Sequence, residues 1–87
     1  MVECLAAKAA RRDKRMTIAY QRALRAGEQK QRDQLRVAQR LWIQYRDANC
    51  LYYMFGEGTI ARVESADCTH RMTKQRAEEL EGKEDRN

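Results

Sequence analysis

The segment Cys50-Leu-Tyr-Tyr-Met-Phe-Gly-Glu-Gly-Thr-Ile-Ala-Arg-Val-Glu-Ser-Ala-Asp-Cys68, residues 50–68, constrains the fold more than any other part of the chain. Its two glycines, Gly56 and Gly58, lie one residue apart between two stretches with helical spacing, which predicts a turn. Helices joined by so short a turn pack side by side in opposite directions. The segment therefore predicts an antiparallel helical hairpin.

The cysteines at the two ends of this segment are candidates for a disulfide. Cys50 precedes the turn by about six residues and Cys68 follows it by about ten, so both lie at similar heights on an antiparallel hairpin. In the chain-entropy model, closing a loop of this size adds about 3 kcal/mol of stability. The alternative is a pair of buried free thiols in a cytosolic protein. The third cysteine, Cys4, has no assigned partner.

Helical periodicity extends outward from the hairpin in both directions. Apolar residues spaced by three or four predict helices over about residues 3–25, 28–54 and 60–80. Gly27 is a natural end for the first helix, because a left-handed cap residue costs glycine little. The charged residues 81–87 are expected to fray. The core stripe expected on the second helix consists of Leu35, Ala38, Leu41 or Trp42, Tyr45, Ala48 or Asn49, and Tyr52.

The composition also favours an all-α fold. The chain has 87 residues, no proline and 36% charged residues, a mixture that suits amphipathic helices better than a sheet. We expect one domain over residues 1–87, a three-helix antiparallel bundle whose second and third helices form a disulfide-stapled hairpin. No apolar run reaches about 18 residues, so no transmembrane segment is expected. No signal peptide is recognised after Met1, which leaves open a mature chain or a truncated start.

The net charge of +5 is unevenly distributed. Residues 8–40 contain eleven Lys and Arg against three acidic residues, whereas residues 57–87 contain six basic and eight acidic residues. The basic half could attract an anionic partner. This makes a cytoplasmic nucleic-acid-binding protein the alternative function. The basic residues are scattered around the first helix, however, without a recognition motif or an aromatic platform, so we do not expect nucleic acid as the partner.

No group of residues suited to catalysis is evident. His70, the only histidine, lies two residues from Cys68, which places the two about 200° apart around a helix. The chain lacks a nucleophile elbow, a phosphate-binding loop and the cysteine and histidine spacings of a zinc site. We expect a protein that is not an enzyme, with no cofactor and no metal site.

The densest group of chemically distinctive residues is Trp42-Ile-Gln-Tyr45-Arg46-Asp47. Trp42 and Tyr45 fall on the expected core stripe, so packing is their first interpretation, although the polar tips of both side chains could reach a partner. Arg46 and Asp47 are expected to form ion pairs or hydrogen bonds with neighbouring helices. The four residues are thus candidates for a structural or a binding role.

The stretch Leu35-Arg-x-Ala-Gln-Arg-x-Trp-Ile-x-Tyr-Arg-Asp-Ala-x-Cys50 resembles the central signature of the LprI-type lysozyme-inhibitor N-terminal-like domain family. The step Gly58-Thr-Ile60 is similar to that family's glycine turn, and residues 68–80 are similar to its closing segment. The opening of the chain matches more loosely. The family's usual Leu-Asn is Met16-Thr17 here, and a cysteine that often precedes the position of Cys4 is absent.

The resemblance implies a helical, exported bacterial domain, periplasmic or secreted, in which Cys50 and Cys68 form a disulfide. It implies a binding module whose partner is a protein such as a lysozyme, or an anionic polymer of the cell envelope. Lysozymes of the common animal type are strongly basic, so the net charge of this chain opposes their association. An acidic patch that could offset this repulsion comprises Glu57, Glu64, Asp67, Glu78 and Glu79.

Overall fold

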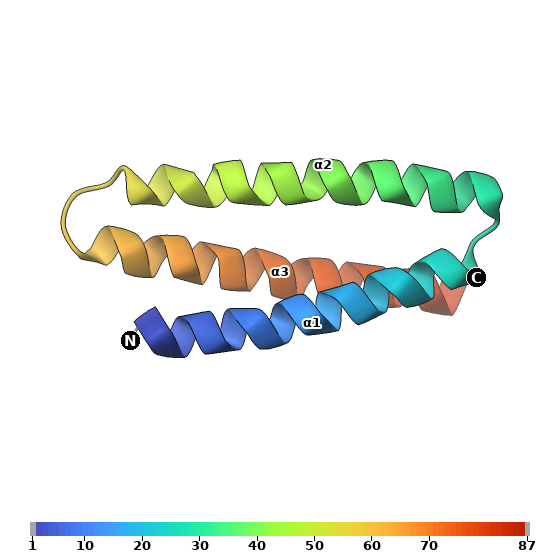
Figure 1. The fold of residues 1–87 in the computed structure, drawn as a ribbon, viewed down its shortest axis with the longest axis horizontal. Coiled ribbons are helices and arrows are strands. Elements are labelled where there is room, and N and C mark those ends of the chain that lie inside the picture. The colour runs from blue at the N-terminus through green and yellow to red at the C-terminus, as the bar shows by residue number, and fades with distance from the viewer. Residues whose placement is uncertain (1, 87) are drawn as a thin grey trace.

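The structure is a computed structural model that describes the backbone of residues 2–86 and the side chains of residues 11 and 13–84. Within that range the chain forms three helices and no strand: α1 (Val2–Ala26), α2 (Gln29–Met54) and α3 (Ile60–Arg86). Figure 1 shows α1 and α3 running in the same direction, with α2 antiparallel to both. The predicted all-α, three-helix antiparallel bundle is confirmed.

The observed helix ends agree with the predicted ones to within about a residue, except at the end of α3. Fraying was expected from Glu81 onward, but α3 remains helical through Arg86, and Asn87 lies outside the described residues. Leu80 is completely buried, and Glu81 forms a two-point ion pair with Arg15 of α1. Both residues contact α1, which is distant in sequence, and these contacts hold α3 against α1 at the point where the sequence of α3 becomes polar.

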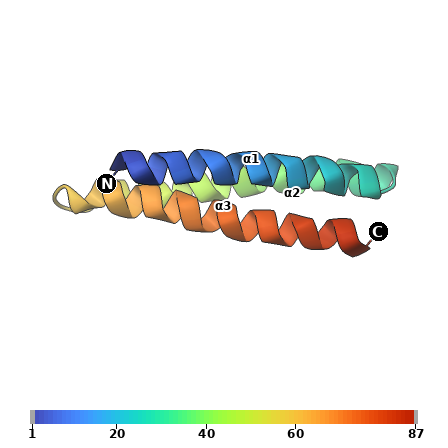
Figure 2. The ribbon, with the colours of Figure 1, turned by 90° about the horizontal axis from the view of Figure 1, so that it is seen from below.

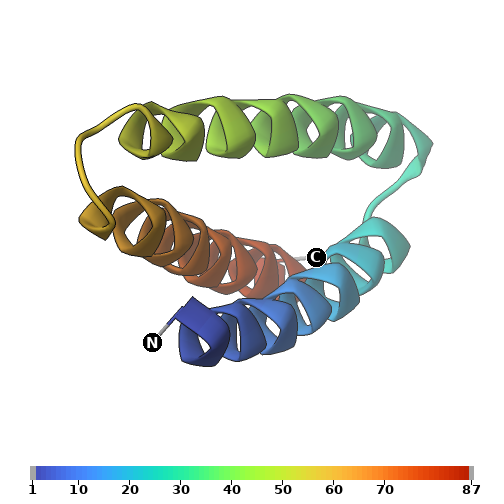
Figure 3. The same ribbon diagram turned by 60° about the vertical axis from the view of Figure 1, so that its left-hand side comes forward.

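The core lies mainly between α1 and α3. These helices are in close contact along the molecule, whereas α2 has little contact with α1 (Figures 1 and 3). Alanines at the α1–α3 contact allow the two backbones to approach closely. Figure 2 shows the result as an elongated, thin molecule, 47 × 21 × 14 Å in extent. The central cluster consists of Met16, Ala19, Ala77 and Leu80, with Tyr20, Leu35 and Trp42 packed against it.

The two connections use glycine for different reasons. Gly58, between α2 and α3, has φ of 77°, a conformation that glycine adopts at little cost. Gly27, between α1 and α2, was expected in the same conformation, but among the described residues only Gly58 has a positive φ. At Gly27 the space is tight instead, because an added Cβ would lie 3.1 Å from the Cβ of Gln31 and one of the two would have to shift slightly.

Candidate functional site

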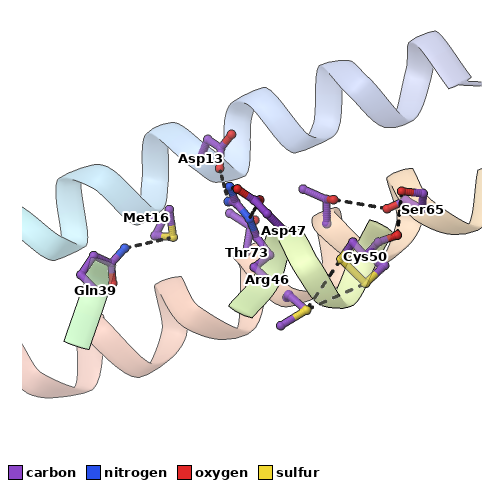
Figure 4. Close-up of polar contacts among 11 residues, drawn as sticks. Asp13, Met16, Gln39, Arg46, Asp47, Cys50, Ser65 and Thr73 are labelled. Atoms are coloured by element: carbon purple, nitrogen blue, oxygen red, sulfur yellow. Dashed lines mark hydrogen bonds and ion pairs between the residues drawn. A yellow bond between two sulfur atoms is a disulfide. The ribbon is translucent and has the colours of Figure 1, made fainter. Parts of the chain in front are cut away.

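A disulfide joins Cys50 of α2 to Cys68 of α3, with the two Cα atoms 5.4 Å apart. Both residues are buried, and the hydroxyl of Ser65 donates a hydrogen bond to the carbonyl of Cys50 at 2.9 Å, a second link between the same helices (Figure 4). The predicted disulfide is confirmed, and the alternative of two free thiols is wrong. The side chain of Cys4 lies outside the described residues.

Arg46 connects all three helices. Its Nη1 donates to Asp13 Oδ1 of α1 at 3.3 Å and to Thr73 Oγ1 of α3 at 3.2 Å (Figure 4). It also pairs with Asp47 of its own helix at 3.1 Å. The Arg46 side chain is only 13% exposed and Thr73 is completely buried, so loss of the guanidinium would remove a donor from a buried hydroxyl. The predicted contacts of Arg46 with neighbouring helices are present.

Two guanidinium groups lie close to the ring of Trp42. The Cζ atom of Arg46 is 5.3 Å from the centroid of the indole ring, and that of Arg76 is 5.8 Å from it. Both distances are within the range of cation–π attraction. The ring is partly buried against the central cluster, as expected from the sequence. The Trp42 side chain therefore packs against the core and also interacts with two cations on the inner side of α2.

Arg76 is a second buried cation that sequence reasoning did not identify as part of a network. Its Nε donates to Gln39 Oε1 at 2.9 Å, and its Nη1 pairs with the carboxylate of Glu79. Gln39 is itself buried, and its Nε2 approaches Met16 Sδ at 3.7 Å (Figure 4). Contacts thus run from α3 through α2 to α1. The sequence does contain a sign of this role, because Arg76 is a charged residue at a position of α3 whose helical spacing places it on the core side.

Two faces of α2 differ in burial. The inner face turns toward α1 and α3, while what we name the outer face is exposed. The predicted core stripe is wrong at Tyr45 and Tyr52, which are 61% and 68% exposed. Where the prediction left two alternatives, Trp42 rather than Leu41 and Asn49 rather than Ala48 face inward. The inner face consists of Leu35, Ala38, Gln39, Trp42, Arg46, Asn49, Cys50 and Tyr53. The outer face consists of Val37, Leu41, Tyr45, Ala48, Tyr52 and Phe55.

The sequence pattern failed here because α2 carries two apolar stripes side by side, and periodicity alone does not distinguish them. The rotation of α2 is set by Cys50, which must reach Cys68, and by Arg46, which must reach Asp13 and Thr73. Asp47 is exposed, and its ion pair is with Arg46 of the same helix, so the contact with a neighbouring helix that we expected for Asp47 is not the one observed.

Cations outnumber carboxylates on α1, whereas α3 carries both kinds of charge in nearly equal number. Arg11, Lys14, Arg22 and Arg25 are all exposed on α1. The predicted acidic patch on α3 is reduced by ion pairs, because two of its carboxylates are paired with arginines. These pairs are Asp67 with Arg71 at 2.8 Å, and Glu79 with Arg76.

The ion pair between Arg15 and Glu81 is the clearest electrostatic contact between α1 and α3. Both carboxylate oxygens accept from the guanidinium at 2.7 Å. The hydrogen bond from Arg15 lowers the pKa of Glu81 below its ordinary value, and the same bond raises the pKa of Arg15. The pair is largely solvated, so we expect it to contribute little to stability.

A cavity of about 430 Å³ opens where α2 begins and α3 ends. No carboxylate, histidine, serine or cysteine lines it, so it lacks an acid–base or nucleophilic pair. Within the described part of the chain, no three side chains gather as ligands for a metal ion. None of the helices that the structure describes is long and apolar enough to cross a membrane. The cavity is lined by Ala23, Gly27, Gln31, Gln34, Leu35, Ala38, Arg76 and Lys83.

Comparison with known protein families gives a match. The family model described as lysozyme inhibitor LprI matches residues 1–80, and so includes both bonded cysteines, the inner-face residues and the turn. Comparisons with curated proteins and with solved structures give no match. Because the matched residues make up most of the chain, the protein belongs to the LprI lysozyme inhibitor family.

Proposed function

We propose that this protein is a non-enzymatic binding module that acts outside the cytoplasm, in the periplasm or after secretion, and inhibits a lysozyme by binding to it. The observation that carries this proposal is the family match over residues 1–80. The disulfide between Cys50 and Cys68 supports export, because such bonds persist in oxidising compartments and are rare in the cytosol.

The net charge predicts how such a complex would respond to salt. The chain carries +5 and its α3 carboxylates are partly paired, so a basic lysozyme is repelled at long range. Salt screens that repulsion over a Debye length of about 8–10 Å near physiological ionic strength. Association with a basic lysozyme should therefore become faster as salt is raised, while contacts at the interface hold the complex together.

The test is a lysis assay on bacterial cell walls, with lysozymes of different structural types and increasing amounts of the oxidised protein. The proposal predicts a saturable fall in the rate of lysis for at least one lysozyme and, where that lysozyme is basic, an association rate that rises with salt. The reduced and alkylated protein, which lacks the Cys50–Cys68 bond, is the matched control. Unchanged lysis by every lysozyme, in the presence of excess folded protein, would contradict the proposal.

The exposed cations of α1 favour a second candidate function, binding to an anionic polymer of the cell envelope. Arg11, Lys14, Arg22 and Arg25 provide positive charge along one helix, which such a polymer would attract. Binding of this kind weakens as salt is raised, the opposite trend to that expected for a basic lysozyme. Nucleic acid would show the same salt trend, but a disulfide-bonded exported protein has less access to it.

A further inference from the structure

The outer face of α2 is a continuous apolar surface that neither of the other two helices covers in the part of the chain that the structure describes. Its residues recur every three or four positions from Val37 to Phe55, so they form a stripe about 27 Å long and about 80° wide. No charged residue lies within the stripe. Phe55 is 82% exposed and Leu41 is 60% exposed. Isolated apolar residues are common on protein surfaces, but a continuous stripe of six marks an interaction site.

The arrangement of the helices explains why this face is bare. α1 packs on α3 and has little contact with α2, which lies along one side of the molecule (Figures 1 and 3). The inner face of α2 is held by Trp42, Arg46 and the Cys50 disulfide. The outer face therefore cannot turn inward unless those contacts are broken.

We propose that the outer face is covered by a second copy of this chain, in a two-fold dimer with the two α2 helices antiparallel. The total exposed area of the stripe is on the order of 700 Å² per copy, from residues of this size at these exposures. A standard protein interface takes about 800 Å² from each partner. The stripe is thus close to the size that a stable dimer needs.

The order of residues along the stripe is self-complementary. If the two-fold axis passes between Tyr45 and Ala48, each of these residues lies opposite the other in the second copy. The same axis places Leu41 opposite Tyr52, and it places Val37 within about one residue, or about 1.5 Å along the helix, of the level of Phe55. At each level a smaller side chain meets an aromatic one, which allows two helices to approach to the usual distance of about 8–10 Å. Such pairing of one patch with itself is the defining property of a two-fold interface.

The charges beside the stripe favour a protein partner over a lipid surface. Along the solvent-exposed border lie Asp33, Arg36, Arg40 and Asp47, two anions and two cations. Arg36 pairs with Asp33 at 3.1 Å, and Asp47 pairs with Arg46 at 3.1 Å. An interfacial helix that binds anionic lipids carries lysine and arginine along its borders without this compensation.

The test is the molar mass of the oxidised protein by light scattering and sedimentation, over a range of concentrations and without any lysozyme. A Cys4→Ser background removes intermolecular disulfides. We expect a monomer–dimer equilibrium, and Leu41→Glu should weaken it at least about tenfold, because it places charge within the stripe. Ile18→Glu, the same change at an exposed apolar residue of α1, should leave the equilibrium unchanged. Circular dichroism checks that both variants remain helical.

The alternatives give distinct results. A wild-type protein that stays monomeric up to about 1 mM, or a dimer that Leu41→Glu leaves intact, overturns the proposal. Binding of the monomer to phosphatidylglycerol vesicles, abolished by Leu41→Glu, would assign the face to lipid instead. Because no lysozyme is present, the outcome does not depend on the proposed inhibitory function.

Discussion

The two faces of α2 differ in polarity in the opposite sense to their burial: the inner face carries more polar residues, and the exposed outer face is apolar. The inner face carries Gln39, Arg46 and Asn49 beside Trp42, while the outer face carries aromatic and aliphatic residues and is exposed. In most helices of small bundles the more apolar stripe is buried. Here the inward face is selected by specific contacts, the disulfide, the largely buried Arg46 and the buried Arg76, and the apolar stripe is left exposed.

The disulfide should have the largest effect on this arrangement. Replacement of Cys50 and Cys68 by alanine should lower the free energy of unfolding by about 3 kcal/mol, because the unfolded chain regains the entropy of an open loop. Urea denaturation in a Cys4→Ser background measures the loss. A loss below about 1 kcal/mol would mean that α2 is held against α3 mainly by its side chains.

Arg46 should have the next largest effect. Arg46→Ala removes hydrogen bonds to α1 and α3 and should lower the free energy of unfolding by about 2 kcal/mol. The matched control is Arg36→Ala, an exposed arginine of the same helix, with an expected change within about 0.5 kcal/mol. Equal losses for the two variants, measured by urea denaturation, would show that Arg46 does not orient α2.

Two adjacent tyrosines allow a smaller and sharper comparison. Tyr52 is exposed on the outer face and Tyr53 is partly buried on the inner face. In the monomer, Tyr52→Ser should change the free energy of unfolding by less than about 0.5 kcal/mol, whereas Tyr53→Ser should lower it by about 1 kcal/mol or more. Thermal denaturation at low protein concentration provides the measurement. A larger loss of stability for Tyr52→Ser than for Tyr53→Ser would mean that the face of Tyr52, and not that of Tyr53, is buried.

The smallest effect is expected at the solvated pair of Arg15 and Glu81. Because the pKa of Glu81 is lowered in the folded protein, its contribution is present above the ordinary pKa of a glutamate. The contribution is lost as pH falls through the lowered value. Glu81→Gln should therefore reduce the thermal midpoint slightly at neutral pH, and the difference from wild type should vanish in acid. A difference that grows in acid would contradict this assignment.

Local sequence was sufficient for the helices and the turn. Helical spacing and the glycines at 56 and 58 located all three helices, and the offsets of Cys50 and Cys68 located the disulfide as a candidate. The helical continuation past Leu80 was missed, because this part of α3 contacts α1, which is distant in sequence, through the buried Leu80 and the pair of Glu81 with Arg15. The rotation of α2 was missed for the same reason, since Arg46 finds its partners on the other two helices.

The most direct test of the central claim is the reactivity of the four tyrosines toward nitration in the dilute, monomeric protein. Tyr45 and Tyr52 are exposed on the outer face, while Tyr20 and Tyr53 are partly buried. Peptide mass spectrometry gives the rate at each site, with the urea-unfolded chain as reference. We predict faster nitration of Tyr45 and Tyr52 than of Tyr20 and Tyr53. Protection of Tyr45 and Tyr52 in the monomer, with Tyr20 and Tyr53 reacting as in the unfolded chain, would contradict the account.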